Sequence, residues 1–205
     1  RRNVLTLMTG TAIAQAMPII ISPILTRIYT PEDFGIFAIY IGLLSIGSVI
    51  ATGRYEMSIL LPKKDLDAVH IVELSILISL FVSIFFMILI ILFDTHIAIL
   101  IGVEAPIYWL YLTPLSIFVF SIYNTLMYWV NRSKEYKSMS KYRIIQSGSI
   151  SIFQVAIGVL GKLSFGLSVS DFFGRLISIV IMLKDMPSVF RFWTFSLKKI
   201  ALARR

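Results

Sequence analysis

The sequence predicts an all-α integral membrane protein with six transmembrane helices. The chain has 205 residues, of which 58% are hydrophobic and 15% are charged, and its mean hydropathy is +0.88. A water-soluble domain of this size could not bury so much apolar surface, so lipid must cover much of it. Long uncharged runs recur along the chain without the period-2 alternation of barrel strands, so the spanning elements must be helices.

Six runs that are uncharged or carry few charges define the expected spans. They are Asn3–Thr26, Phe34–Gly53, Leu74–Phe93, Ala105–Val130, Ile144–Gly161 and Phe165–Leu183. The second run extends to Leu61 if Arg54 and Glu56 are tolerated, and the sixth contains Asp171 and Arg175. Residues 1–186 are therefore expected to form one six-helix lobe, with helices at about 4–29, 33–61, 67–93, 105–130, 142–161 and 165–184.

The distribution of basic residues predicts the topology. Cytoplasmic segments of membrane proteins are rich in Lys and Arg. If six spans alternate from a cytoplasmic N-terminus, 15 of the 19 Lys and Arg residues lie on the cytoplasmic side. Only Arg27 and Lys162 lie outside, while Arg54 and Arg175 fall within spans. We therefore expect both ends of the chain in the cytoplasm.

Residues 187–205 have the pattern of an amphipathic tail. Phe190, Trp193, Leu197 and Ile200 recur at helical spacing among basic residues. This pattern is typical of a helix that lies on the inner membrane surface, and a linker made helical only by its context is equally compatible. The chain lacks an initiator Met and stops amid basic residues, so we expect a cytoplasmic tail that leads to a second lobe of a longer protein.

Polar or small residues follow helical spacing in four of the six spans. The stripes are Thr11, Gln15, Ser22 and Thr26; Ser45, Ser48, Thr52 and Glu56; Ser147, Ser151, Gln154, Gly158 and Gly161; and Ser168, Asp171, Arg175 and Ser178. Such residues let membrane helices approach closely and hydrogen-bond, and this packing role is favoured for the fifth span. Taken together, the four stripes favour a bundle around a wet cavity.

Charges inside the spans are the first candidates for function, because buried charges in membranes are costly. Arg54 and Glu73 are expected at similar depth on antiparallel neighbouring helices, so they are predicted to pair, with Glu56 left on the polar stripe. The alternative is that the long side chains reach the membrane interface. Asp171 and Arg175 have the i, i+4 spacing of a favourable pair. They either face a transport path or form a purely structural pair within one helix.

The sequence gives little sign of enzyme chemistry. The two histidines, His70 and His96, are expected near opposite membrane faces, and there is no cysteine. No phosphate-binding glycine loop of the nucleotide-hydrolysing type is present. The basic residues form short clusters between apolar runs, which does not indicate nucleic-acid binding. We therefore expect no catalytic activity, no metal, no cofactor and no nucleic-acid partner.

Two stretches carry a resemblance to a known family. ILTRIYTPEDFGIF (24–37) and ATGRYEMSILLPKKDLDA (51–68) resemble the N-terminal half of bacterial polysaccharide transporters of the O-antigen flippase type. These are related to the multidrug and toxin extrusion exporters. The resemblance implies two lobes around a central cavity with alternating access, of which this chain would be the first. The implied activity is flipping of an undecaprenyl-pyrophosphate-linked oligosaccharide across the bacterial inner membrane for surface polysaccharide synthesis.

The resemblance also suggests roles for the polar residues. Arg54 and Arg175 are candidates to hold the pyrophosphate, and Gln15 and Gln154 suit sugar hydroxyls. The acids Glu56, Glu73 and Asp171 could instead couple transport to H⁺ or Na⁺, as in an ion-coupled drug or cation antiporter of the same superfamily. A non-transporting membrane scaffold is a further alternative. Expected partners are the lipid-linked oligosaccharide, membrane lipids, and the polysaccharide polymerase and chain-length machinery.

Overall fold

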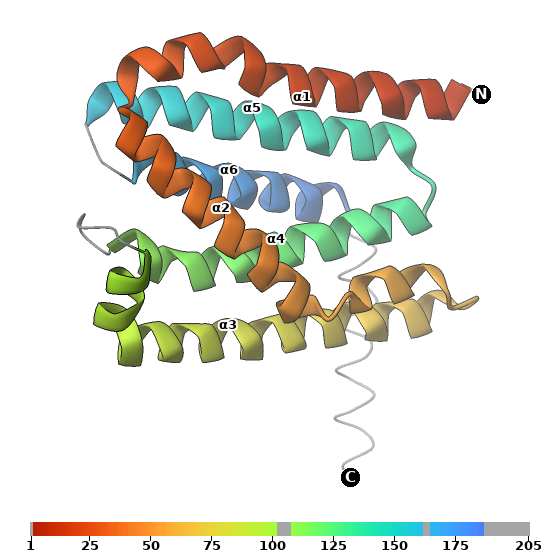
Figure 1. The fold of residues 1–205 in the computed structure, drawn as a ribbon. Coiled ribbons are helices and arrows are strands. Elements are labelled where there is room, and N and C mark those ends of the chain that lie inside the picture. The colour runs from red at the N-terminus through yellow and green to blue at the C-terminus, as the bar shows by residue number, and fades with distance from the viewer. Residues whose placement is uncertain (1, 102–107, 162–164, 187–205) are drawn as a thin grey trace.

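The computed structural model describes residues 2–101, 108–161 and 165–186, and these residues form helices joined by short turns (Figure 1). The elements are α1 (Arg2–Ile28), α2 (Pro31–Thr52), the 3-10 helix η1 (Tyr55–Leu60), α3 (Asp65–Ile101), α4 (Tyr108–Arg132), α5 (Tyr136–Leu160) and α6 (Gly166–Asp185). Six helices in the described part of the chain are long and apolar enough to cross a membrane. The predicted fold class is confirmed.

The helices pack as two groups. In the first group α1 lies along α5, and α5 packs on α6. In the second group α3 packs on α4, while α2 crosses α4 diagonally and contacts both of them. The groups meet mainly where α6 packs on α4. The N-terminal end of α1, the turn between η1 and α3, and the turn between α4 and α5 lie at the same end of the bundle (Figure 1).

The elbow between α1 and α2 is fixed by local sequence. The Asp33 backbone N–H donates to Thr30 Oγ1 at 3.3 Å, and the Thr30 N–H donates to Asp33 Oδ2 at 2.9 Å. This reciprocal capping box begins α2, and Pro31 takes the first helical position, where no N–H is needed. Tyr29 just before it is buried, and its hydroxyl donates to the Gln154 carbonyl of α5 at 2.8 Å.

The second helix is shorter than predicted. We expected it to continue to Leu61, but α2 ends at Thr52. Gly53 has φ 52° and Arg54 has φ 58°, so two successive residues are left-handed. A left-handed glycine is the usual stop of an α-helix, because glycine has no Cβ to clash. The chain then turns into η1, which packs against α3 and α4.

Two other boundaries differ from the predictions by more than a helical turn. The third helix runs beyond position 93 to Ile101, through a kink at Phe93 (φ −126°, ψ 17°). The fifth begins at Tyr136 instead of 142, so part of the basic segment expected between spans is helical. The predicted tail, residues 187–205, lies outside the described residues.

Small residues allow the helices to approach closely. A Cβ at Gly10 of α1 would collide with Ser140 of α5, and a Cβ at Gly174 of α6 would collide with the Ile150 backbone of α5. Hydroxyls inside the bundle bond largely to their own helix: Thr125 Oγ1, for example, donates to the Ser121 carbonyl at 2.8 Å. Many of the predicted polar positions therefore serve helix packing, as small and hydroxylated residues do in membranes.

Candidate functional site

A polar cavity of about 600 Å³ lies between α1, α4 and α5, where the two helix groups are not in close contact. We call it the polar cavity. Its walls are Thr11, Ala14 and Gln15 of α1; Tyr123, Asn124, Met127, Tyr128 and Asn131 of α4; and Met139, Arg143, Gln146, Ser147 and Ile150 of α5. The volume is within the range of small-molecule binding sites, about 300–1,000 Å³.

Arg143 supplies the only charge among the lining residues of this cavity. It lies in the second turn of α5, and its Nη1 donates to Thr11 Oγ1 of α1 at 3.0 Å. Thr11 is neutral and cannot compensate the positive charge. The four ion pairs within residues 2–101, 108–161 and 165–186 all involve other basic side chains. A partly buried cation without a carboxylate partner is costly and therefore favours an anionic ligand.

The other polar walls are neutral. Four side-chain amides line the cavity, from Gln15, Asn124, Asn131 and Gln146, together with the rings of Tyr123 and Tyr128. Ser147 Oγ donates to the Ala14 carbonyl at 2.6 Å, so it also joins α5 to α1. Amides and hydroxyls can both donate and accept hydrogen bonds. The cavity therefore suits an anionic ligand that carries hydroxyl groups.

Asp171 and Arg175 are paired as their spacing predicts, but they do not line the polar cavity. Arg175 donates from Nε and Nη2 to the two carboxylate oxygens of Asp171, both at 2.8 Å. The Tyr40 hydroxyl of α2 donates to Asp171 Oδ2 at 3.3 Å. The Arg175 guanidinium lies 4.4 Å from the ring centre of Phe120 of α4. These contacts support the structural alternative, because both charges are already compensated within the bundle.

The predicted pair between Arg54 and Glu73 is not formed. Arg54 is exposed in the turn after α2, and Glu73 Oε2 instead lies 3.2 Å from His70 Nδ1 one turn away. The prediction assumed that the helix continued past Arg54, whereas the left-handed turn at Gly53 ends it. Glu56 is buried in η1, and its Oε2 has no hydrogen-bond partner among the described residues.

The two predicted glutamines have different surroundings. Gln15 is exposed on α1 and lines the polar cavity. Gln154 is buried on α5 outside the cavity, where its backbone carbonyl receives the Tyr29 hydroxyl. Its stripe neighbour Gly158 lies against Ile28 and Tyr29. On the α5 stripe, Gln154 and Gly158 therefore pack inside the bundle, while Ser147 lines the polar cavity.

Arg143 is the site residue that sequence reasoning missed. The predicted topology places Arg143 between the fourth and fifth spans, among the 15 Lys and Arg residues on the cytoplasmic side. The signal was present, because Arg143 lies one turn before Ser147 and two turns before Ser151 on the same helical stripe. Extending that stripe back by one turn identifies Arg143, provided that the helix is known to begin at Tyr136.

A second cation, Arg132 at the end of α4, is fully engaged. Its Nη1 donates to the carbonyls of Ile59 at 3.0 Å and Pro62 at 2.6 Å. Its Nε and Nη2 donate to Asp65 Oδ1 at 3.3 and 3.0 Å. Arg132 therefore ties the end of η1 and the start of α3 to α4, and has little capacity left for a ligand.

The comparisons with known proteins point to one family. The family model described as polysaccharide biosynthesis protein matches residues 24–202, which includes only the C-terminal end of α1 and all of the following helices that the structure describes. Neither the curated proteins nor the solved structures give a match. The chain is a multi-pass membrane protein that belongs to the polysaccharide biosynthesis protein family.

Proposed function

We propose that the protein moves an undecaprenyl-pyrophosphate-linked oligosaccharide across the bacterial inner membrane by alternating access. The observation that carries this proposal is the polar cavity inside a bundle of membrane-spanning helices, with Arg143, which has no carboxylate partner among the described residues. Membership of the polysaccharide biosynthesis family supports a role in making surface polysaccharide. The lipid-linked form of the substrate and the transport step go beyond the family assignment and are our proposal.

The chemistry of the cavity fits such a substrate part by part. A guanidinium binds phosphate oxygens through paired N–H groups, so Arg143 is suited to the pyrophosphate. The amides of Asn124, Asn131 and Gln146 are suited to sugar hydroxyls, and the Tyr128 ring can cover a sugar face. The isoprenoid tail would remain in the surrounding lipid, because most of the outward-facing side chains of the bundle are apolar.

The cavity favours a transported anion over a transported cation. None of its lining residues is an acid. An ion-coupled antiporter remains the second candidate because of Glu56, whose buried carboxylate has an oxygen without a partner in the described part of the chain. Glu56 lies outside the polar cavity, so it fits a coupling role better than a substrate-binding role. We propose no enzymatic step and no cofactor.

A complementation experiment tests the proposal. Cells that lack the gene would receive the full-length protein or its variants Arg143→Gln and Arg143→Lys. We expect Arg143→Gln to abolish surface polysaccharide and to leave lipid-linked oligosaccharide in the inner leaflet, whereas Arg143→Lys retains part of the activity. Lys137→Gln is the matched control, because Lys137 is exposed on the same helix and does not line the cavity. Immunoblots would confirm equal amounts of protein.

Two outcomes would contradict the proposal. Normal polysaccharide with Arg143→Gln would remove Arg143 from the transport path. Loss of polysaccharide with no lipid-linked oligosaccharide retained in the inner leaflet would place the protein at a different step. For the antiporter alternative, cells that express the protein would be assayed for export of cationic dyes, and dye export that depends on Glu56 but not on Arg143 would favour it.

A further inference from the structure

A second hollow lies at the end of α4, beside the polar cavity. Its volume is about 690 Å³, and its walls come from η1, the start of α3, the end of α4, the turn after α4 and the start of α5. We call it the end groove. Asn131 lines both hollows, but the end groove alone is lined by charges of both signs, which belong to Asp65, Arg132 and Lys134.

The end groove lies where three candidate membrane spans end. Asp65 begins the span in α3, Arg132 ends the span in α4, and Tyr136 begins the span in α5. All three residues line the groove. Because the hydrocarbon core of a bilayer ends where its spans end, the groove lies at the level of the lipid headgroups. Trp129 and Tyr136 in its wall fit this level, since tryptophan and tyrosine are enriched at membrane interfaces.

Asp65 has one engaged carboxylate oxygen and one that is available to a ligand. Its Oδ1 accepts from Nε and Nη2 of Arg132 at 3.3 and 3.0 Å. Its Oδ2 has no hydrogen-bond partner in the part of the chain that the structure describes, and the side chain is 67% exposed. Arg132 also donates to two backbone carbonyls, so it holds the carboxylate in place and does not itself bind a ligand. A carboxylate oxygen in this setting is suited to accept from an ammonium group.

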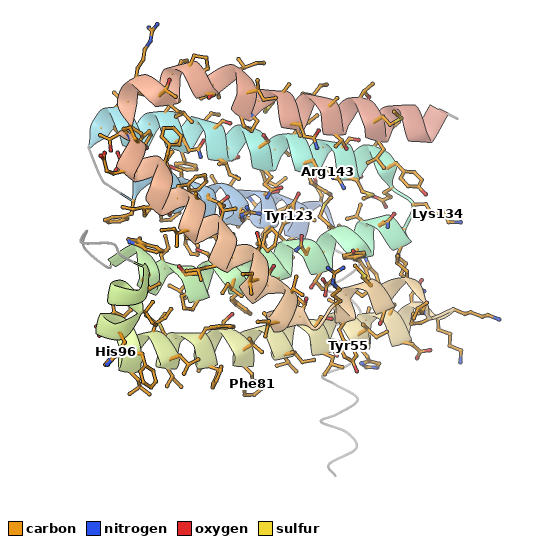
Figure 2. The ribbon with its side chains drawn as sticks, in the orientation of Figure 1. Tyr55, Phe81, His96, Tyr123, Lys134 and Arg143 are labelled. Atoms are coloured by element: carbon orange, nitrogen blue, oxygen red, sulfur yellow. The ribbon has the colours of Figure 1, made fainter. Side chains whose placement is uncertain are left out.

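Lys134 supplies a cation to the same groove. It lies in the turn between α4 and α5, at the end of the bundle (Figure 2). None of the four ion pairs of the described residues involves it. The turn is well defined, because the Lys134 N–H donates to the Asn131 carbonyl at 3.0 Å and the Glu135 N–H donates to the Val130 carbonyl at 3.3 Å. The Lys134 ammonium is therefore kept beside the groove and can donate to a phosphate oxygen.

Exposed apolar side chains lie beside these charges. Leu60 of η1 lines the groove and is exposed, Leu61 after it is 80% exposed, and Leu66 in the first turn of α3 is exposed as well. Charges of both signs next to exposed leucines match an amphiphile with a zwitterionic head and apolar chains. A water-soluble ligand would contact the charges and leave the leucines unused, so the arrangement favours a phospholipid.

We propose that the end groove binds the headgroup of phosphatidylethanolamine. The primary ammonium of this lipid donates to Asp65 Oδ2, and its phosphate accepts from the Lys134 ammonium. The acid selects this headgroup, because the Asp65 carboxylate repels the anionic phosphatidylglycerol and the quaternary ammonium of phosphatidylcholine has no N–H to donate. The site goes beyond the proposed transport, since neither Asp65 nor Lys134 lines the polar cavity. A bound headgroup would connect the start of α3 to the turn between α4 and α5.

Lipid competition measured by native mass spectrometry tests the site. The full-length protein would be purified in detergent, depleted of lipid and mixed with equal amounts of phosphatidylethanolamine and phosphatidylglycerol. We expect the wild type to retain phosphatidylethanolamine in preference, and Asp65→Asn to lose that preference by roughly threefold to tenfold, the effect of one charge-assisted hydrogen bond. Lys134→Gln should retain less of both lipids, because both carry the phosphate. Phosphatidylcholine should compete poorly with phosphatidylethanolamine for the wild type and equally well for Asp65→Asn.

Two variants serve as matched controls. Asp67→Asn and Lys137→Gln remove the same charges from exposed positions that do not line the end groove, so both should retain lipid like the wild type. Asp65→Asn also weakens the contact with Arg132, and retention of phosphatidylglycerol separates the two effects. If only the ammonium acceptor is lost, Asp65→Asn retains phosphatidylglycerol at least as well as the wild type does.

Four results would overturn the site. A wild type that prefers phosphatidylglycerol has an anionic-lipid surface and no ammonium acceptor in the groove. An unchanged preference in Asp65→Asn removes Asp65 from the contact. Loss of both lipids in Asp65→Asn assigns that residue a structural role through Arg132. Equal losses in the two control variants assign lipid retention to the overall charge of this end of the bundle.

Discussion

Arg175 and Asp171 are joined across one turn of α6 by two parallel hydrogen bonds of 2.8 Å. Their side chains are only 11% and 4% exposed. Tyr40 of α2 and Phe120 of α4 complete the surroundings of the pair. The pair therefore connects three helices inside the bundle and leaves no free charge for a substrate. The contrast with Arg143, which has no carboxylate partner among the described residues, identifies the polar cavity as the candidate site.

Breaking this pair should destabilise the protein. Arg175→Gln leaves the Asp171 carboxylate buried without its cation, and removing one partner of a buried pair typically costs about 3–5 kcal/mol. We expect a large drop in the melting temperature of the purified protein. The double variant Asp171→Asn with Arg175→Gln should melt higher than Arg175→Gln, because no uncompensated charge remains. A single variant that melts like the wild type would show that the pair is not buried in the membrane-embedded protein.

Arg132 should control the mobility of the segment from η1 to α3. Its guanidinium bonds to the Ile59 and Pro62 carbonyls and to Asp65, and a lysine ammonium cannot reproduce this planar set. Hydrogen bonds to charged groups contribute about 1.5–3 kcal/mol each. Arg132→Lys should therefore speed amide hydrogen exchange in this segment by at least about tenfold, measured by mass spectrometry. Lys137→Gln serves as the control. Equal exchange in both variants would contradict the role of Arg132 in fixing the segment from η1 to α3.

Gly174 should not tolerate a methyl group. A Cβ there would collide with the Ile150 backbone of α5, which cannot move as a side-chain end can. Overpacking of this kind costs about 1–3 kcal/mol, so Gly174→Ala should lower the melting temperature. Gly42→Ala is the matched control, because no atom beyond its chain neighbours and its own helix backbone lies within 4 Å of its Cβ position in the interior of α2. We expect Gly42→Ala to be neutral or stabilising, since alanine forms helices better than glycine.

Tyr29 should stabilise the elbow between α1 and α2 in a manner that depends on pH. Tyr29→Phe removes the hydrogen bond to the Gln154 carbonyl, worth about 0.5–1.5 kcal/mol. Burial, and to a lesser extent the Asp33 carboxylate, raise the pKa of Tyr29. Its contribution is therefore complete below the usual tyrosine pKa of about 10 and is lost as the pH rises through the raised value.

Melting curves from pH 8 to above pH 10 test this dependence on Tyr29. The difference in melting temperature between the wild type and Tyr29→Phe should be largest at the lower pH and should shrink as Tyr29 ionises. Tyr55→Phe, at an exposed position, should show no such trend. A difference that stays constant across the range would mean that the ionisation of Tyr29 is not linked to unfolding.

Much of the fold could be predicted from the sequence because membrane helices are local structures. Runs of apolar residues identify the spans, and the Asp171–Arg175 pair follows from a spacing within one helix. The start of α2 at Pro31, two residues before the expected position 33, has a local signal that the prediction did not use, the Thr30 and Asp33 capping box. The end of α2 at Thr52 was missed, because the apolar residues after Arg54 continue in η1 and resemble more helix.

By itself, the sequence determined the class of protein, the six helices and the resemblance to polysaccharide transporters, because these depend on composition and on spacings along the chain. Only the tertiary structure decided which charges are compensated. Thr11 contacts Arg143, and Tyr40 contacts Asp171, although more than a hundred residues separate the partners in each case. Whether a charge is available to a ligand depends on its neighbours from other helices, and helical periodicity alone does not specify those neighbours.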